Sequence, residues 1–323
     1  MSGKNRTIIK ILRWLLLAVI PFLMMTFFIM GKSDVQAQKP LKILIVYDHE
    51  GTPGVVSRTQ TEGGTEYGTA RQWGTKAVNA AIEGALKAGA TEILVSDGHG
   101  SKETILPDML HKDALLIRGG PIAPYSMAHG ATYPGVDAIM LVSFHARAGA
   151  PDAVLCHTIT GNIENLWVND VLVGETGYAA AVAGAVNIPI IFVSGDRALC
   201  KEAQSLLGGD LEAAEVKWIE PGAAMMVTCL HPEKANDIIR KKAEAAVEKF
   251  KRGVFKPYPV KKPTTVKVQL NVMGLHYWTY AELAVQIPGV KRVDPTTVSF
   301  TGDPLEALNF VRVLASNLAG YKK

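Results

Sequence analysis

Four mostly apolar runs constrain the fold more than any other feature of this sequence, because helical patterns alternate with them. The runs cover residues 41–47 (LKILIVY), 92–95 (EILV), 138–144 (AIMLVSF) and 188–193 (IPIIFV). Such runs are typical of strands that are buried on both faces. Residues 69–87, 175–186 and 232–251 have helical patterns instead. The alternation predicts an α/β fold with a largely parallel sheet flanked by helices.

A proline-rich stretch separates this region from the C-terminal part of the chain. Pro257, Pro259 and Pro263 lie close together there, and they predict the end of a helix followed by a linker. Beyond them, residues 265–272 and 297–301 alternate like strands, and residues 279–286 and 304–319 have helical patterns. We therefore expect an α/β domain over residues 41–255 and a smaller C-terminal α+β domain over residues 264–323.

The N-terminus has the order of an export signal. Basic residues come first, an uncharged apolar run covers residues 14–30, and Val35-Gln36-Ala37 forms a small-residue cleavage site. The apolar run is also at the lower edge of the length that spans a bilayer, so an uncleaved anchor is the alternative. Residues 1–37 are thus predicted to be a signal peptide or a membrane anchor. Both alternatives place the body outside the cytoplasm, periplasmic or extracellular, with membrane contact only through this segment.

Charge and cysteine content exclude two classes of protein. The formal net charge is +4, and residues 1–37 account for all of it, so the body of the chain is neutral. A neutral body lacks the basic surface that nucleic-acid binding requires. The three cysteines are scattered along the chain, unlike the paired spacing of a disulfide framework or a structural zinc site.

Acidic residues and histidines follow three of the apolar runs directly. Asp48 and Glu50 follow the first run, His99 follows the second, and His145 follows the third. Because ligands bind beyond the carboxyl ends of strands in an open α/β sheet, we expect these side chains to meet at one edge. Any one of them could instead be a turn former or a helix cap. Together, mixed carboxylate and imidazole ligands suit zinc or a similar divalent metal.

Two further residues are candidates on weaker signals. His157 lies on a turn-rich loop after the third run, where it could reach the same edge and transfer protons near neutral pH, or could simply be a surface histidine. Residues 167–173 predict a hairpin turned at Asn169-Asp170, and Glu175 follows it in the first turn of a helix. Glu175 could be a metal ligand, or could interact only with the helix dipole.

In order and approximate spacing, these motifs resemble the D-aminopeptidase family of zinc metallopeptidases, the dipeptide-transport-operon type. The resemblance runs from residue 41 to the C-terminus and rests on Asp48-x-Glu50-Gly51, Asp97-x-His99, His145-Ala146-Arg147-Ala148, His157, Asn169-Asp170, Gly174-Glu175, Gly195-Asp196-Arg197 and Lys201-Glu202-Ala203.

The resemblance implies a specific metal site and activity. It implies two Zn²⁺ ions per subunit, with family ligands on Asp48, Glu50, His99, His145 and Glu175. The catalytic histidine of the family falls on His157. The implied substrates are short peptides with a D-residue at the free amino end, and the implied assembly is a ring-shaped homo-oligomer. The implied nucleophile is a metal-activated water, which His157 assists or replaces. The family members are cytoplasmic, and the export signal sets this chain apart from them.

Two other functions remain open at the level of sequence. The same metal centre could serve an amidase or an esterase that acts on another small substrate, because a fold does not fix the bond that is cleaved. A non-catalytic exported binding protein of the same fold is a third possibility. All five ligand positions carry residues able to bind metal, which favours the enzyme.

Overall fold

A seven-stranded sheet forms the centre of the molecule. The computed structural model describes residues 40–120, 124–222, 225–271 and 277–319. The strands of this sheet are β1 (Lys42–Tyr47), β2 (Glu92–Asp97), β3 (Ala114–Ile117), β4 (Ala138–Phe144), β7 (Ile190–Asp196), β8 (Glu212–Ile219) and β9 (Val227–Cys229). Their spatial order is β3-β2-β1-β4-β7-β8-β9. All neighbours are parallel except β8 and β9, which confirms the predicted largely parallel sheet.

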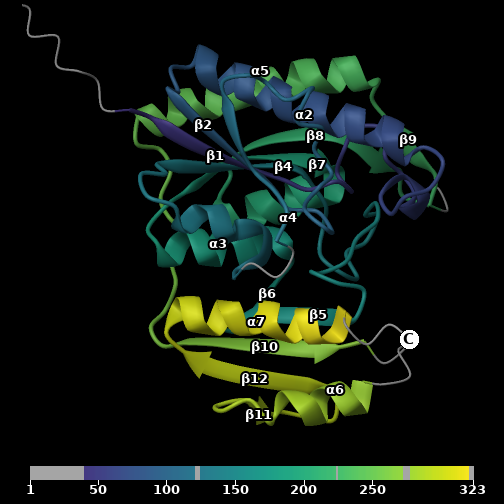
Figure 1. Ribbon diagram of the computed structural model, residues 1–323, viewed down its shortest axis with the longest axis vertical. Helices are drawn as coiled ribbons and strands as arrows, with labels where there is room; N and C mark the ends of the chain where they lie inside the picture. The colour runs from purple at the N-terminus through teal and green to yellow at the C-terminus, as the bar shows by residue number, and fades with distance from the viewer. Residues whose placement is uncertain (1–39, 121–123, 223–224, 272–276, 320–323) are drawn as a thin grey trace, which may run out of the picture. The chain divides into compact units, whose positions relative to one another are not determined.

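Helices cover both faces of this sheet (Figure 1). On one face, α2 (Tyr67–Lys87) packs against β1 and β4 and α5 (Pro232–Lys251) packs against β7 and β8, and Ile43 and Ile45 of β1 belong to the hydrophobic cluster of this face. On the other face, α3 (Glu175–Ala185) packs against β4 and α4 (Arg197–Leu207) packs against β7 and β8, and Leu44 and Val46 of β1 belong to the hydrophobic cluster of this face. Because side chains of a strand alternate between faces, an apolar strand needs a helix layer on each side. Two short 3₁₀ helices, η1 (Arg58–Gln60) and η2 (Ser126–Thr132), lie in the loops.

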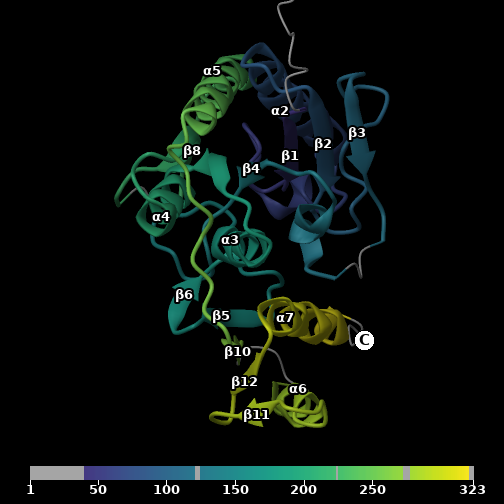
Figure 2. The ribbon, with the colours of Figure 1, turned by 90° about the vertical axis from the view of Figure 1, so that its left-hand side faces the viewer.

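A second, antiparallel sheet has the order β11-β12-β10-β5-β6. It contains β5 (Ile163–Val168), β6 (Val171–Val173), β10 (Thr264–Leu270), β11 (Lys291–Arg292) and β12 (Thr297–Gly302). Two helices accompany it, α6 (Tyr277–Ala284) and α7 (Pro304–Ala319), and Figure 2 shows α7 between this sheet and α3. Buried residues of α3, α7 and both sheets belong to one hydrophobic cluster.

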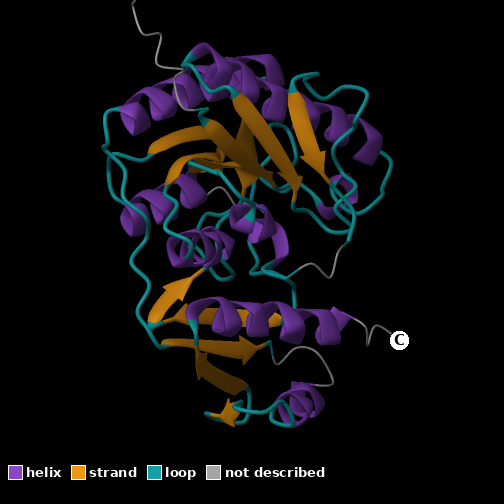
Figure 3. Cartoon of the chain, turned by 60° about the vertical axis from the view of Figure 1, so that its left-hand side comes forward, coloured by secondary structure: helices purple, strands orange, loops and turns teal. Residues whose placement is uncertain are grey.

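The predicted hairpin at Asn169-Asp170 is confirmed, but its place in the fold differs from the expectation. Residues 163–173 were expected within the region 41–255, whereas β5 pairs with β10 in the second sheet, with Val168 opposite Val266. The physical reason is that β10 exposes a bonding edge that β5 completes. Strands from both sides of the proline linker therefore form this sheet. Figure 3 shows the two sheets as separate sets of strands with helices between them.

The expected export segment, residues 1–37, lies outside the described residues and stays a prediction. Among the residues that the structure describes, no helix is long and apolar enough to cross a membrane. The three cysteines, Cys156, Cys200 and Cys229, are all free, as their spacing predicted.

The strand order creates a switch point at the centre of the large sheet. From β1 the chain proceeds outward to β2 and β3, and it then returns to β4 on the other side of β1. Residues that follow β1 and β4 therefore meet at the point of an open α/β sheet where ligands bind.

Candidate metal centre

The structure brings all six candidate residues together at this switch point. Asp48 follows the last residue of β1, His99 follows β2 by two residues, and His145 follows β4 directly. Glu175 is the first residue of α3, and His157 comes from the loop after β4. The loops after β1, β2 and β4 and the start of α3 thus converge on one edge of the sheet, as the positions after the strands predicted.

Asp48 lies at the centre of the cluster. Its Oδ1 is 3.2 Å from Nδ1 of His99, and its Oδ2 is 3.3 Å from Nε2 of His145. The same Nδ1 of His99 is 3.0 Å from Oε2 of Glu50. The two oxygens of one carboxylate therefore face two different imidazoles, an arrangement that allows a carboxylate to bridge two ions.

The second half of the cluster contains His145, Glu175 and His157. Oε1 of Glu175 is 3.3 Å from Nε2 of His145 and 3.5 Å from Nε2 of His157. The rings of His145 and His157 are stacked, with their centroids 4.0 Å apart. Atoms of these three residues lie within 4.8 Å of one another, as do atoms of Asp48, Glu50 and His145.

Backbone carbonyls orient the three imidazoles. The other ring nitrogen of each lies near a carbonyl oxygen: His99 Nε2 is 3.1 Å from Thr61 O, His145 Nδ1 is 2.9 Å from Ala146 O, and His157 Nδ1 is 3.0 Å from Leu155 O. A carbonyl can only accept, so each of these nitrogens carries the hydrogen of the neutral ring. The remaining nitrogen of each ring faces the carboxylates, where its lone pair could bind a metal ion held between them, as in metal-binding histidines.

The donor atoms are spaced like metal ligands, and several of them are buried without a hydrogen-bond partner. Zinc–nitrogen and zinc–oxygen bonds of about 2.0–2.1 Å at tetrahedral angles place neighbouring ligand atoms about 3.3 Å apart. The separations around Asp48 are 3.0–3.3 Å. Asp48 Oδ2, Glu50 Oε2 and His145 Nε2 are buried and make no hydrogen bond with any described residue. Buried polar atoms without partners are costly, and a divalent cation would satisfy them. The residues present therefore fit zinc.

Charges within the cluster shift the pKa values of its members strongly. Burial alone would lower the pKa of His99 and His145, but the carboxylates beside them raise it well above 6.5. Burial alone would raise the pKa of Asp48, but the two imidazoles hold it well below its usual range. Without a metal, protons on the imidazoles compensate the buried carboxylates, so protons and zinc compete for the same positions.

Gly51 allows the loop after β1 to approach the end of β4. Its N–H donates to Ser143 O at 2.7 Å. A Cβ atom at this position would lie 2.0 Å from Phe144 O and 2.4 Å from Ser143 O. Only glycine permits this approach, which sets the distance between Asp48 on one loop and His145 on the other.

Lys217 of β8 stabilises the loop after β1 through its side chain. It is fully buried, and its ammonium donates to the carbonyl oxygens of Glu50, Thr52 and Val55. Burial lowers its pKa to about 8, against the attraction of Asp196, so the ammonium is charged at neutral pH. No sequence motif marks Lys217 as functional, because it is a single lysine in a segment of mixed composition.

Lys102 is a second buried lysine that the sequence analysis missed. It follows His99 by three residues and is 5% exposed. Burial and the Arg312 guanidinium lower its pKa to about 8. Its ammonium lies close enough to Asp97, Asp48 and Glu175 to interact with their charges.

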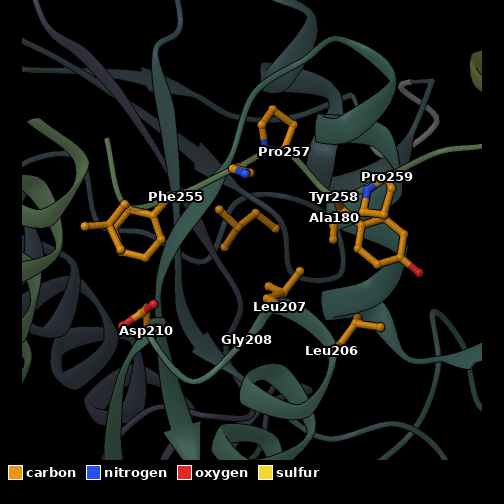
Figure 4. Close-up of a pocket in the computed structure, with 12 residues that line it drawn as sticks. Ala180, Leu206, Leu207, Gly208, Asp210, Phe255, Pro257, Tyr258 and Pro259 are labelled. Carbon is orange, nitrogen blue, oxygen red and sulfur yellow. The ribbon is translucent and has the colours of Figure 1, made fainter. Parts of the chain in front are cut away.

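Two cavities of similar size differ in their relation to this centre. One of about 260 Å³ lies beside His99 and is lined by Thr61, Tyr67 and Ser101, among others, so it opens the centre to the surface. The other, of about 280 Å³, lies between the middle of α3, the end of α4 and the linker at Phe255–Pro259 (Figure 4). It contains none of the six candidate residues, so it is not the site of the chemistry.

Comparisons with known proteins agree with the site. A family model described as D-aminopeptidase matches residues 41–313. A D-aminopeptidase of Bacillus subtilis (strain 168) is 32% identical over 282 residues, which is 85% of this chain and 96% of that protein. The solved structure of DppA from Bacillus subtilis, described as a Zn-dependent D-aminopeptidase and a self-compartmentalizing protease, aligns with a TM-score of 0.78 and 29% identity. The alignment covers 88% of this chain and 99% of that one. The chain therefore belongs to the D-aminopeptidase family of metallopeptidases.

Proposed function

We propose that this chain is a zinc-dependent aminopeptidase that hydrolyses short peptides with an N-terminal D-amino acid. The observation that carries the proposal is the state of the three histidines. Each has one nitrogen directed at a backbone carbonyl and the other directed at the buried carboxylates. Membership of the family supports the stereochemistry of the substrate.

We propose that the cluster holds two zinc ions. Glu50 and His99 would bind one ion, His145 and Glu175 would bind the other, and Asp48 would bind both. Two zinc ions bound there would polarise the scissile carbonyl and lower the pKa of a water molecule. The division follows the distances, because the two oxygens of Asp48 face His99 and His145 separately.

His157 would transfer protons. Its Nδ1–H faces Leu155 O, so its Nε2 is free to take a proton from the attacking water and pass it to the leaving amine. The His157 side chain is 18% exposed, more than those of His145 and Glu175, so a substrate can reach it. Its stacking on the ring of His145 fixes the orientation of the imidazole.

Substitutions separate a ligand from a proton-transfer residue. The His99→Ala protein should lose zinc affinity at least about 10–100-fold, together with its activity. The His157→Ala protein should keep both zinc ions and lose about 10²–10⁴-fold in kcat. Zinc content is measured by mass spectrometry after dialysis. A His157→Ala protein that has lost an ion would identify His157 as a ligand instead.

The substrate is tested with matched pairs of D- and L-aminoacyl dipeptides, amides and esters, before and after removal of zinc. We expect turnover of D-dipeptides that stops with chelator and returns with zinc. Turnover of the L-series alone would refute the stereochemistry, and turnover of esters alone would favour an esterase.

We propose that the protein is exported and forms a homo-oligomer. The basic start, the apolar run at residues 14–30 and the small residues before Ala37 support export. The self-compartmentalizing relative supports self-association. Fractionation of cells, with the mass of the N-terminal peptide, tests the first proposal, and light scattering of the purified protein tests the second. A protein found only in the cytoplasm, or a monomer at micromolar concentration, would contradict them.

A further inference from the structure

Lys102 has a buried positive charge that the protein itself does not pair. The residue is 5% exposed, and its ammonium makes no hydrogen bond or ion pair with any described residue. Its backbone is fixed, because its N–H donates to His99 O at 2.7 Å and its carbonyl accepts from Gly119 N at 2.7 Å. Burial of an unpaired charge is costly, so this ammonium gains most from an anion that arrives from outside.

The backbone of Lys102 is also in an unusual conformation. Its φ is +61°, in the left-handed region that glycine adopts without steric cost. Lys102 has this sterically unfavourable backbone conformation three residues after His99. Strain of this kind concentrates at functional sites.

The charges around Lys102 show what kind of ligand fits beside it. Asp97, Asp48 and Glu175 attract the ammonium, and the guanidinium of Arg312 on α7 repels it. Asp48 and Glu175 would be neutralised by zinc under the proposed function, and one oxygen of Asp97 already accepts from Ile105 N. Lys102 then lies beside the metal centre with Asp97 as the carboxylate that still attracts it and Arg312 of α7 as the cation that repels it.

We propose that Lys102 binds the C-terminal carboxylate of a dipeptide substrate and so selects dipeptides. This inference rests on the proposed function, because it assumes a peptide at the metal centre. In a dipeptide the carboxyl carbon is two bonds from the nitrogen of the scissile bond, about 2.5 Å away. Lys102 follows His99 by three residues, is 5% exposed, and lies close enough to Asp48 and Glu175 to interact with their charges, so a carboxylate at this distance from the scissile bond would approach its ammonium. In a longer peptide an uncharged amide takes this place, and the buried ammonium stays unpaired.

The test compares one peptide with and without its carboxylate. D-Alanyl-D-alanine and D-alanyl-D-alaninamide have the same scissile bond, and release of D-alanine is measured for both. The unaltered protein should prefer the acid about 10–100-fold in kcat/KM, the range of one charge-assisted hydrogen bond. Lys102→Met should abolish the preference by lowering kcat/KM for the acid, mainly through KM, and should leave the amide nearly unchanged. The matched control is Lys112→Met, which removes an exposed positive charge from the loop before β3, at the amino end of that strand.

An equal loss on both substrates in Lys102→Met would overturn the assignment, because the lysine would then act on the reacting carbonyl. Retained preference for the acid would overturn it as well. Calorimetric binding of the two peptides to the zinc-loaded His157→Ala protein gives a second readout, independent of turnover. If the unaltered protein cleaves neither peptide, the proposed function fails. The binding comparison still decides the role of Lys102, since equal affinities for acid and amide contradict it.

Discussion

Gly51 offers the sharpest test of how the fold builds the metal centre. In Gly51→Ala the new Cβ would lie 2.0 Å from Phe144 O, whereas ordinary contact begins at 3.4 Å. Both atoms in the clash belong to the main chain or are bonded directly to it, so no side-chain rotation relieves it. The loop after β1 must therefore move away from β4 by about 1.4 Å, as the difference between these two distances requires.

The displacement has consequences for zinc and for stability. Zinc sites tolerate deviations of about 0.2 Å in ligand distance, several-fold less than this movement. Because Asp48 moves with the loop and His145 stays on β4, their shared site opens. We expect zinc affinity to fall at least about 10–100-fold. The free energy of unfolding of the zinc-free protein should fall by about 3 kcal/mol, the upper end of overpacking costs.

The measurements are zinc affinity by chelator competition and stability by urea unfolding. Gly68→Ala is the matched control, since Gly68 lies in α2, is exposed, and a Cβ there would meet nothing within 4 Å. That control should bind zinc normally and gain up to about 1 kcal/mol from helix propensity. Normal zinc affinity in Gly51→Ala would refute the argument that close approach of the two loops sets the site.

Two further predictions concern Lys217 and the competition between zinc and protons. Lys217→Met leaves three buried carbonyl oxygens without their donor, so it should lower the free energy of unfolding by about 3 kcal/mol. The control Lys201→Met replaces an exposed lysine and should change this free energy by less than about 0.5 kcal/mol. Equal effects of the two substitutions in urea unfolding would contradict the prediction. The raised pKa of His99 and His145 should stabilise the zinc-free protein fully below pH 6.5, and this contribution should disappear as the pH rises through the raised values. Zinc affinity should show the opposite trend and fall as the pH falls, with protons released on binding. Calorimetry in buffers of different ionisation enthalpy measures the protons, and a zinc-free protein equally stable at about pH 6 and about pH 9 would refute the stability prediction.

Sequence-based prediction succeeded where local pattern and structure coincide. The apolar runs at residues 41–47 and 138–144 correspond to β1 and β4, and the helix predicted at residues 232–251 has the observed bounds of α5. The sequence pattern did not predict strand β8, because its sequence EAAEVKWI contains few strand-forming residues. That segment is a strand because it pairs with β7 and β9, so its tertiary neighbours decide its conformation.

The sequence by itself determined which residues could form a metal centre. In a parallel sheet the carboxyl ends of all strands lie at one edge, so residues after successive strands must come near one another. Only the tertiary structure decided which atoms face each other: the two oxygens of Asp48 toward two imidazoles, and the free nitrogen of His157 toward Glu175. Only the fold brings Lys217 of β8 beneath the loop that carries Glu50. Such contacts join residues far apart in the chain, and no local pattern encodes them.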